Sequence, residues 1–341
     1  MANKLYEESD IQDIADAIRS KTGSSATYTV SQMAQAIENI PSGGGGDRDW
    51  TEIGYVQEPS AIESGFRYAK EILENWDEAT TSVYAMFRND KKLLFFPSVN
   101  SPNIRGSALF MFDGCRNIMA VGNLNTKNIT DMQYMFGDCS FLSSIPNLNT
   151  SNVTNMYGMF SSCSALTAIP QLNTSKVTDM QRMFYNCSAL TAIPQLDTSK
   201  VTNMNSMFCY CKNLTAIPQL DTSNVTDTQH MFYNCSALSS IPNLNTSMAI
   251  SMTCMFSDCQ KLVTVPQLNL LKATTLTLMF HNCDVLSNES LNNIMASCIS
   301  ATSYTSTKTL KYMGLSSTQA TTCQSLSNYQ AFLNAGWTTG Y

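Results

Sequence analysis

The dipeptide Met-Phe recurs in this chain every 24 residues, and a cysteine follows four positions after each of these methionines. The eight copies run from Met111-Phe112 to Met279-Phe280. A repeat of about 20–50 residues is typical of solenoid proteins, in which each unit buries its apolar side only against its neighbours. The period therefore predicts a stacked array of rungs and makes most enzyme folds improbable.

The middle of each rung has the spacing of a short helix. In the unit Leu172–Gln195, Thr178 and Gln181 are placed as a helix capping box, and Asn186 tolerates the left-handed conformation that ends a helix. The apolar residues fall at i, i+3, i+4 and i+7, which is one helix face: Met180, Met183, Phe184 and Cys187. We therefore expect a capped helix of about two turns in every rung.

The following stretch, Ala189–Pro194, has the character of a short strand that its proline ends. The sequence Leu-Asn/Asp-Thr-Ser then predicts a turn with Asx-type hydrogen bonds. One strand and one helix per rung predict an α/β solenoid, a leucine-rich-repeat-like right-handed stack of 24-residue strand–turn–helix rungs. A small N-terminal helical hairpin and a helical C-terminal cap complete the expected fold.

The recurring Met, Phe and Cys are predicted to form the buried core of the array. The core positions are Met135, Phe136, Cys139, Met159, Phe160, Cys163, Met183, Phe184, Cys187, Met207, Phe208, Cys211, Met231, Phe232 and Cys235. The chain has twelve cysteines, and stacking of equivalent positions with parallel side chains disfavours disulfides, so we expect reduced thiols that act as small apolar groups. Structural zinc is the alternative, but the closest cysteine pair is Cys209-x-Cys211, which is not a zinc-ligand spacing. No metal or cofactor is expected.

The ends of the chain depart from the repeat. Residues 1–42 predict a helical attachment or oligomerisation module, residues 43–50 a Gly-rich linker, and residues 51–75 an N-terminal cap. The solenoid is assigned to residues 76–291 and a C-terminal cap to residues 292–341, with helices expected at 287–298, 316–325 and 328–335. The hairpin is too small to bury a core alone, so we expect it to pack on a partner or on copies of itself.

The composition argues against several function classes. Charged residues make up 13% of the chain, the net charge is −6, and no basic patch is evident, which disfavours nucleic-acid binding. No apolar stretch is long enough to span a bilayer or to act as a signal peptide, so synthesis in a bacterial cytoplasm without membrane insertion is expected. Neither a nucleophile–base motif nor a phosphate-binding loop is present, and the two histidines vary from rung to rung, so we expect no enzyme activity.

Binding is the expected use of such an array, and the candidate contacts are large side chains where rungs differ. They are Tyr134, Tyr157, Arg182, Tyr185, Tyr210, His230 and Tyr233. Aromatic residues and arginine are favoured in contact sites, and tyrosine also stacks on sugars. The alternative is unselected variation on a solvated face. The nearly uniform Thr-Ala-Ile-Pro-Gln strand face would suit a repetitive ligand such as a wall polysaccharide, and the sequence leaves the choice between the two faces open.

The rungs resemble BspA-like leucine-rich repeats and, more closely, the lipoprotein-associated tandem repeats of bacterial surface proteins. The resemblance extends from about Trp76 to Leu291 and is carried by units such as Leu196-Asp-Thr-Ser-Lys-Val-Thr-Asn-Met-Asn-Ser-Met-Phe208. The segment Tyr6–Gly23 resembles the start of tail and minor structural proteins of phages that infect Gram-positive bacteria. The closing segment, Gly336–Tyr341, is similar to the ends of proteins from the same setting.

These resemblances imply a phage tail or baseplate-associated structural protein, located in the virion, whose rod binds a protein or polysaccharide of the host cell surface. Residues 1–42 would contact other tail proteins, and a homo-oligomer, by analogy with fibres a trimer, is expected. One alternative is a structural or decorating virion protein without a recognition role. The other is a bacterial surface adhesin, which would need an export route that we do not find in the sequence.

Overall fold

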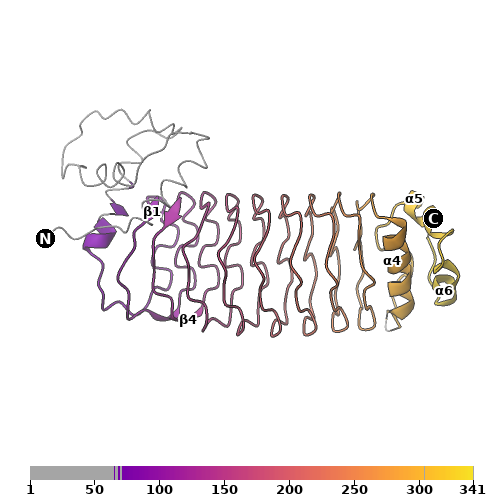
Figure 1. Ribbon diagram of the computed structural model, residues 1–341, viewed down its shortest axis with the longest axis horizontal. Coiled ribbons are helices and arrows are strands. Elements are labelled where there is room, and N and C mark those ends of the chain that lie inside the picture. The colour runs from indigo at the N-terminus through magenta and orange to yellow at the C-terminus, as the bar shows by residue number, and fades with distance from the viewer. Residues whose placement is uncertain (1–64, 66–67, 70, 303, 341) are drawn as a thin grey trace, which may run out of the picture.

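The computed structural model describes residues 65, 68–69, 71–302 and 304–340. Figure 1 shows similar rungs stacked side by side along one long axis, with helices at the C-terminal end. The predicted repeat solenoid is confirmed. The predicted hairpin at residues 1–42 and the linker at 43–50 lie outside the described residues. Among the described helices, none is long and apolar enough to cross a membrane.

Parallel pairing between successive rungs holds the stack together. Strand β1 (Phe95–Phe96) pairs with β3 (Ala120–Val121), and β2 (Arg105–Ser107) pairs with β4 (Asn128–Asp131). Beyond β4 the pairing continues as one isolated parallel bridge per rung, at Asp131, Asn155, Asp179, Asn203, Asp227, Ser251 and Thr275. The sheet is therefore reduced to a narrow ladder along the axis.

The predicted rung helix is wrong. Between residues 76 and 287, all of which the structure describes, there is no α-helix, and the Met-Phe segments form successive turns. Alternate N–H groups donate to the carbonyl three residues back, as from Cys187 to Phe184 at 3.1 Å. The intervening groups donate to the next rung, as from Phe184 to Met207 at 2.9 Å. An α-helix would use all of these donors within itself.

Two left-handed residues per rung produce this alternation. Arg182 and Asn186 both have φ of 56°, and equivalent residues of the other rungs are also left-handed. The left-handed conformation predicted for the Asp or Asn before the cysteine is confirmed, but it does not end a helix. Thr178 does not cap a helix either, because its Oγ1 donates to Thr154 O of the preceding rung at 3.3 Å.

The predicted strand at Ala189–Pro194 is also wrong for most rungs. That position carries a ladder at β1–β3, where the N–H of Gly122 donates to Phe96 O at 2.7 Å, and a single bridge between Ser240 and Thr264. Most other rungs have proline where Gly122 stands, and proline has no N–H to donate. The ladder therefore forms on the other side of the rung, at the Asp179 position.

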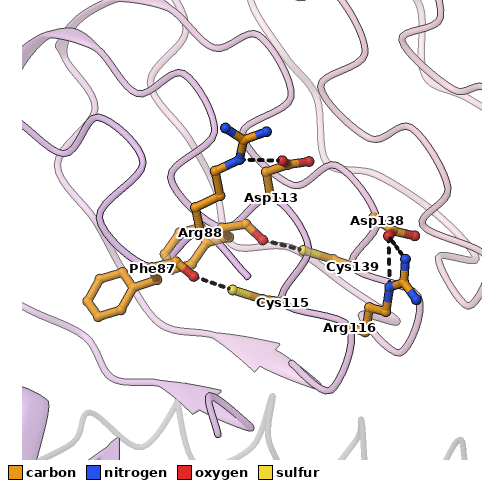
Figure 2. Close-up of polar contacts among 8 residues, drawn as sticks. Phe87, Arg88, Asp113, Cys115, Arg116, Asp138 and Cys139 are labelled. Atoms are coloured by element: carbon orange, nitrogen blue, oxygen red, sulfur yellow. Dashed lines mark hydrogen bonds and ion pairs between the residues drawn. The ribbon is translucent and has the colours of Figure 1, made fainter. Parts of the chain in front are cut away.

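The buried core includes a column of phenylalanines and a column of cysteines that run the length of the array, together with columns of methionine and aliphatic residues. The phenylalanine rings of successive rungs are stacked, as for Phe184 and Phe208 with centroids 5.6 Å apart and an angle of 7° between planes. The predicted reduced state of the cysteines is confirmed, since all twelve are free. They are more than small apolar groups, however. Cys115 Sγ donates to Phe87 O at 2.9 Å (Figure 2), and seven further rungs repeat this contact at 3.0–3.2 Å.

The three helices expected after the last rung are present as α4 (Asn288–Ser300), α5 (Ser317–Cys323) and α6 (Tyr329–Asn334). The C-terminal segment accepts hydrogen bonds from backbone N–H groups of the last rungs, which have no further rung to donate to. Serine hydroxyls of α4 accept three of these, among them Leu268 N at Ser297 Oγ at 2.8 Å. Phe280 N donates to Met313 O at 2.8 Å. The C-terminal end thereby satisfies donors that would otherwise be left unpaired.

Candidate functional site

The variable side chains of the Met-Phe segment form one surface, which we call the turn face. It comprises three columns: the residue before the methionine, the residue after the phenylalanine, and the residue before the cysteine. Arg182, Tyr185 and Asn186 are the members from one rung. The inward Met, Phe and Cys between them are buried, so the turn face is the outer side of the same turns.

All seven candidate contact residues belong to one connected row on or beside this face. Tyr157 packs on Tyr134 with ring centroids 5.0 Å apart. Arg182 interacts electrostatically with Tyr134, and its guanidinium lies 5.5 Å from the Tyr185 ring centroid. The row continues by edge-to-face contacts from Tyr185 to Tyr210 at 5.8 Å, from Tyr210 to Tyr233 at 5.3 Å, and from Tyr233 to His230 at 5.8 Å. Arg182 is exposed and the other six are half-buried.

The backbone of the first column is strained to hold these side chains. Tyr134, Arg182 and His230 have φ of 46°, 56° and 54°, in the left-handed region that favours glycine. Such a conformation costs about 1–3 kcal/mol for a non-glycine residue and persists where the surrounding structure enforces it. Here the inter-rung hydrogen bonds before and after each position enforce it.

Tyr134 occupies space that two glycines leave open. A Cβ at Gly158 would lie 2.5 Å from the Tyr134 ring, and one at Gly137 would lie 2.9 Å from it. Burial and a hydrogen bond with Tyr157 raise the pKa of Tyr134 to about 12, so its hydroxyl is protonated at neutral pH. The ring therefore covers the two adjoining rungs and closes the surface there.

Further along the array the turn face is hollowed into a shallow groove of about 490 Å³. Tyr185, Tyr210 and Tyr233 line one end of the groove, and His281 lies at the other. Burial lowers the pKa of His230, which also lines the groove, so its imidazole is neutral at pH 7. Burial raises the pKa of Tyr233 to about 12. The groove thus presents aromatic faces, a neutral imidazole and one carboxylate, that of Asp258.

A second shallow groove of about 480 Å³ lies on the Gln-Leu-Asx-Thr-Ser edge, which follows the predicted Thr-Ala-Ile-Pro-Gln face along the chain. Its polar groups are already engaged with each other: Gln195 Nε2 donates to Gln219 O at 2.6 Å, and Asp197 Oδ1 accepts from Ser199 Oγ at 2.7 Å. The predicted Asx turns are confirmed, because the N–H of Ser199 donates to Asp197 Oδ1 at 3.1 Å and other rungs repeat this contact.

Sequence reasoning missed the small residues of the turn face. Ser206, Cys209, Cys254 and Ser257 line the groove between the large residues, and Leu278 and His281 form its far end. The signal was present in the sequence, because large and small residues alternate between successive rungs at these columns. No group of three or more His, Cys, Asp or Glu side chains that could hold a metal ion occurs in the described part of the chain.

The repeat array matches a known sequence family over more than half of the chain. The family is described as "Mycoplasma protein of unknown function, DUF285", and it matches residues 107–216 and 189–294. No curated protein matches the sequence.

Solved structures with similarity to this chain include three bacterial repeat proteins. A leucine-rich repeat protein of T. pallidum is 17% identical, with 60% of this chain and 81% of that chain covered and a TM-score of 0.40. A leucine-rich repeat protein of Eubacterium ventriosum is 20% identical, with 55% and 58% covered and a TM-score of 0.36. The internalin inlF of Listeria monocytogenes is 14% identical, with 89% of each chain covered and a TM-score of 0.30. These scores are too low to carry an argument, and the solenoid is established by the chain's own hydrogen bonds.

Proposed function

The chain belongs to the DUF285 family, and we propose that this member is a non-enzymatic binding protein that contacts its ligand through the turn face. The observation that supports this proposal is the connected row of seven large side chains, six of them half-buried, on an array whose other outward positions are mostly Ser, Thr and Asn. Tyrosine and arginine contribute much of the energy at protein contact sites. Half-buried side chains held by their neighbours lose little conformational freedom on binding.

The proposed setting is a phage tail or baseplate, in which the rod recognises the surface of the bacterial host. The resemblance of Tyr6–Gly23 to the start of phage tail proteins supports it, and residues 1–42 would attach the rod to other tail proteins. The ligand would be a surface protein or polysaccharide. A long array with similar rungs gives room for many weak contacts in series, which favours an extended ligand.

Immunogold labelling of purified phage particles with antibody against the full chain tests the setting, and label at the tail tip is expected. Competition between the purified full chain and virions for adsorption tests the binding role. The triple variant Tyr185→Ala, Tyr210→Ala, Tyr233→Ala should lose competition. Its matched control is the triple variant Thr167→Ala, Thr191→Ala, Thr215→Ala, with three exposed residues off the turn face, and this control should compete as the natural chain does.

Two other functions predict different results. A structural or decorating virion protein would be found on the particle, but its deletion would leave adsorption intact. A bacterial surface adhesin would be found on prophage-free cells. If the turn-face triple variant competes with virions as well as the natural chain and the control do, the turn face is not the binding surface.

A further inference from the structure

In the first two columns of the turn face, large and small side chains alternate between successive rungs from Gly158 to His281. The first two columns carry large pairs at Arg182/Tyr185, His230/Tyr233 and Leu278/His281, and small pairs at Gly158/Ser161, Ser206/Cys209 and Cys254/Ser257. The backbone repeats every 24 residues, but this surface repeats every 48. A rung with small residues between two rungs with large ones forms a notch one rung wide.

Two of the three notches line the groove of the turn face, and we call these two open; Tyr210, from the third column, lines the groove beside the first of them. Ser206 and Cys209 form the floor of the first, with relative exposures of only 7% and 4% beneath the flanking side chains. Cys254 and Ser257 form the floor of the second. The pair His230 and Tyr233 is the wall between them.

The third notch is covered. Its floor residue Gly158 lies under the Tyr134 ring, since a Cβ at this glycine would lie 2.5 Å from the ring. The open part of the surface therefore has two notches and one central wall. This limits the length of ligand that the surface can accommodate.

The spacing of the notches selects among extended polymers. Stacked Phe208, Phe232 and Phe256 are separated by 5.5 and 5.6 Å, so equivalent points of the two notches are two such steps apart. Side chains on one face of an extended peptide recur every ~6.7 Å, and those of a polyproline II helix every ~9.3 Å, both shorter than two rungs. Two consecutive sugars of an extended 1,4-linked glycan span close to two rungs.

The chemistry of the notches also suits a neutral sugar. The faces of Tyr185, Tyr210 and Tyr233 can pack against the C–H face of a pyranose ring. His230 is neutral at pH 7, because burial lowers its pKa. Asp258 is the only carboxylate that lines the groove.

We propose that the two open notches bind a neutral, extended 1,4-linked glycan, with one sugar ring of each two-sugar unit in each notch. This inference rests on the proposed function of the turn face and specifies the class of ligand. The small rungs accept the sugar rings, and the His230/Tyr233 wall separates the two units.

Titration calorimetry of the full chain with N-acetylglucosamine oligomers linked β-1,4 tests this proposal through chain length. The tetramer should bind at least about tenfold more tightly than the dimer, because the second unit binds at high effective concentration. The hexamer should show no comparable further gain, because the surface has only two open notches. Affinity that rises equally at every added sugar, or no binding by any of the three oligomers, would overturn the proposal. Oligoproline of matched length should not bind.

A variant that fills one notch gives the second test. The double variant Ser206→His, Cys209→Tyr copies the side chains that the next rung already holds at the same columns, so the fold should accept it. It should remove the advantage of the tetramer over the dimer. Tyr233→Ala removes the ring of the central wall, and it should also reduce the affinity of the tetramer to that of the dimer. Ala192→Tyr adds an aromatic ring at an exposed position off the turn face and should leave both affinities unchanged.

Failure of the glycan inference is distinguishable from failure of the proposed function. If the turn-face triple variant loses competition with virions while no N-acetylglucosamine oligomer binds, the turn face is the binding surface and its ligand is of another class. If neither the triple variant nor the filled-notch variant changes competition, both proposals are wrong.

Discussion

The Sγ atom of Cys187 donates a hydrogen bond to the carbonyl oxygen of Phe160 in the preceding rung, at 3.1 Å. The same oxygen accepts the N–H of Cys163 at 3.1 Å, so one carbonyl joins two rungs. Burial raises the pKa of the Cys187 thiol well above its ordinary value, which keeps the proton on the sulfur. The column therefore uses cysteine as a donor that is small enough for a close-packed interior.

Removal of this donor should weaken the stack at one rung. Cys187→Ala should lower the free energy of unfolding by about 1 kcal/mol, because it removes one buried hydrogen bond and a sulfur atom. Urea denaturation followed by circular dichroism measures the change. The control is Cys254→Ala, at the one cysteine of the twelve that is not buried, which should change stability by less than about 0.5 kcal/mol. Equal effects of the two variants would argue against a stabilising role for the thiol ladder.

The cysteines should differ sharply in their reactivity toward thiol reagents. Only Cys254 is partly exposed, so one thiol per molecule should react with Ellman's reagent before unfolding. Burial also raises the pKa of Cys254, and its reaction should therefore accelerate as the pH rises through and above the ordinary thiol range, because the thiolate is the nucleophile. Cys254→Ser should abolish the early reaction. Rapid labelling of several thiols in the natural chain would contradict the buried column.

Gly158 should tolerate no larger residue while Tyr134 is present. Gly158→Ala places a Cβ 2.5 Å from the tyrosine ring at a φ of +59°, so it combines a steric clash with an unfavourable backbone conformation. We expect a loss of more than about 1–2 kcal/mol, the backbone contribution alone. A double-mutant cycle with Tyr134→Ser should recover the steric part and leave the backbone part. Strict additivity of the two changes would show that the ring and the glycine do not interact.

Acidification should destabilise the chain through His230. Burial lowers the pKa of this imidazole below 6.5 in the folded state, so the unfolded chain binds the proton more tightly. The corresponding stability is present above the unfolded pKa of about 6.5 and is lost as the pH falls from there toward the lower folded pKa. His230→Gln should therefore flatten the dependence of the unfolding free energy on pH between about 7 and 5. The exposed His281 is the control, and His281→Gln should keep the natural slope.

The sequence was sufficient to predict the period, the buried columns and the C-terminal helices, because the spacing of apolar residues along the chain determines each of them. It was insufficient for the path of the backbone within a rung. Met180, Met183, Phe184 and Cys187 have the spacing of a helix face, yet a succession of turns buries the same four residues. Periodicity reports which side chains are buried, but it does not report whether an N–H donates within the rung or to the next one.

The candidate site likewise has a part that the sequence predicted and a part that it did not. Comparison between rungs found Tyr185, Tyr210 and Tyr233, because large residues stand out from a uniform background. It did not find Ser206 and Cys209, because a small residue on a polar surface carries no signal by itself. Their significance depends on the side chains one rung before and one rung after, which only the stacked structure brings together.

The difference between the backbone period and the surface period has a consequence for how such genes can change length. Recombination between similar 24-residue units can add or delete one rung, and the backbone hydrogen bonds across the junction can be rebuilt. A single added unit would nevertheless place two large rungs or two small rungs next to each other. Variants that gain or lose pairs of units would keep the alternation, so natural relatives of different length that share this ligand should differ by even numbers of rungs.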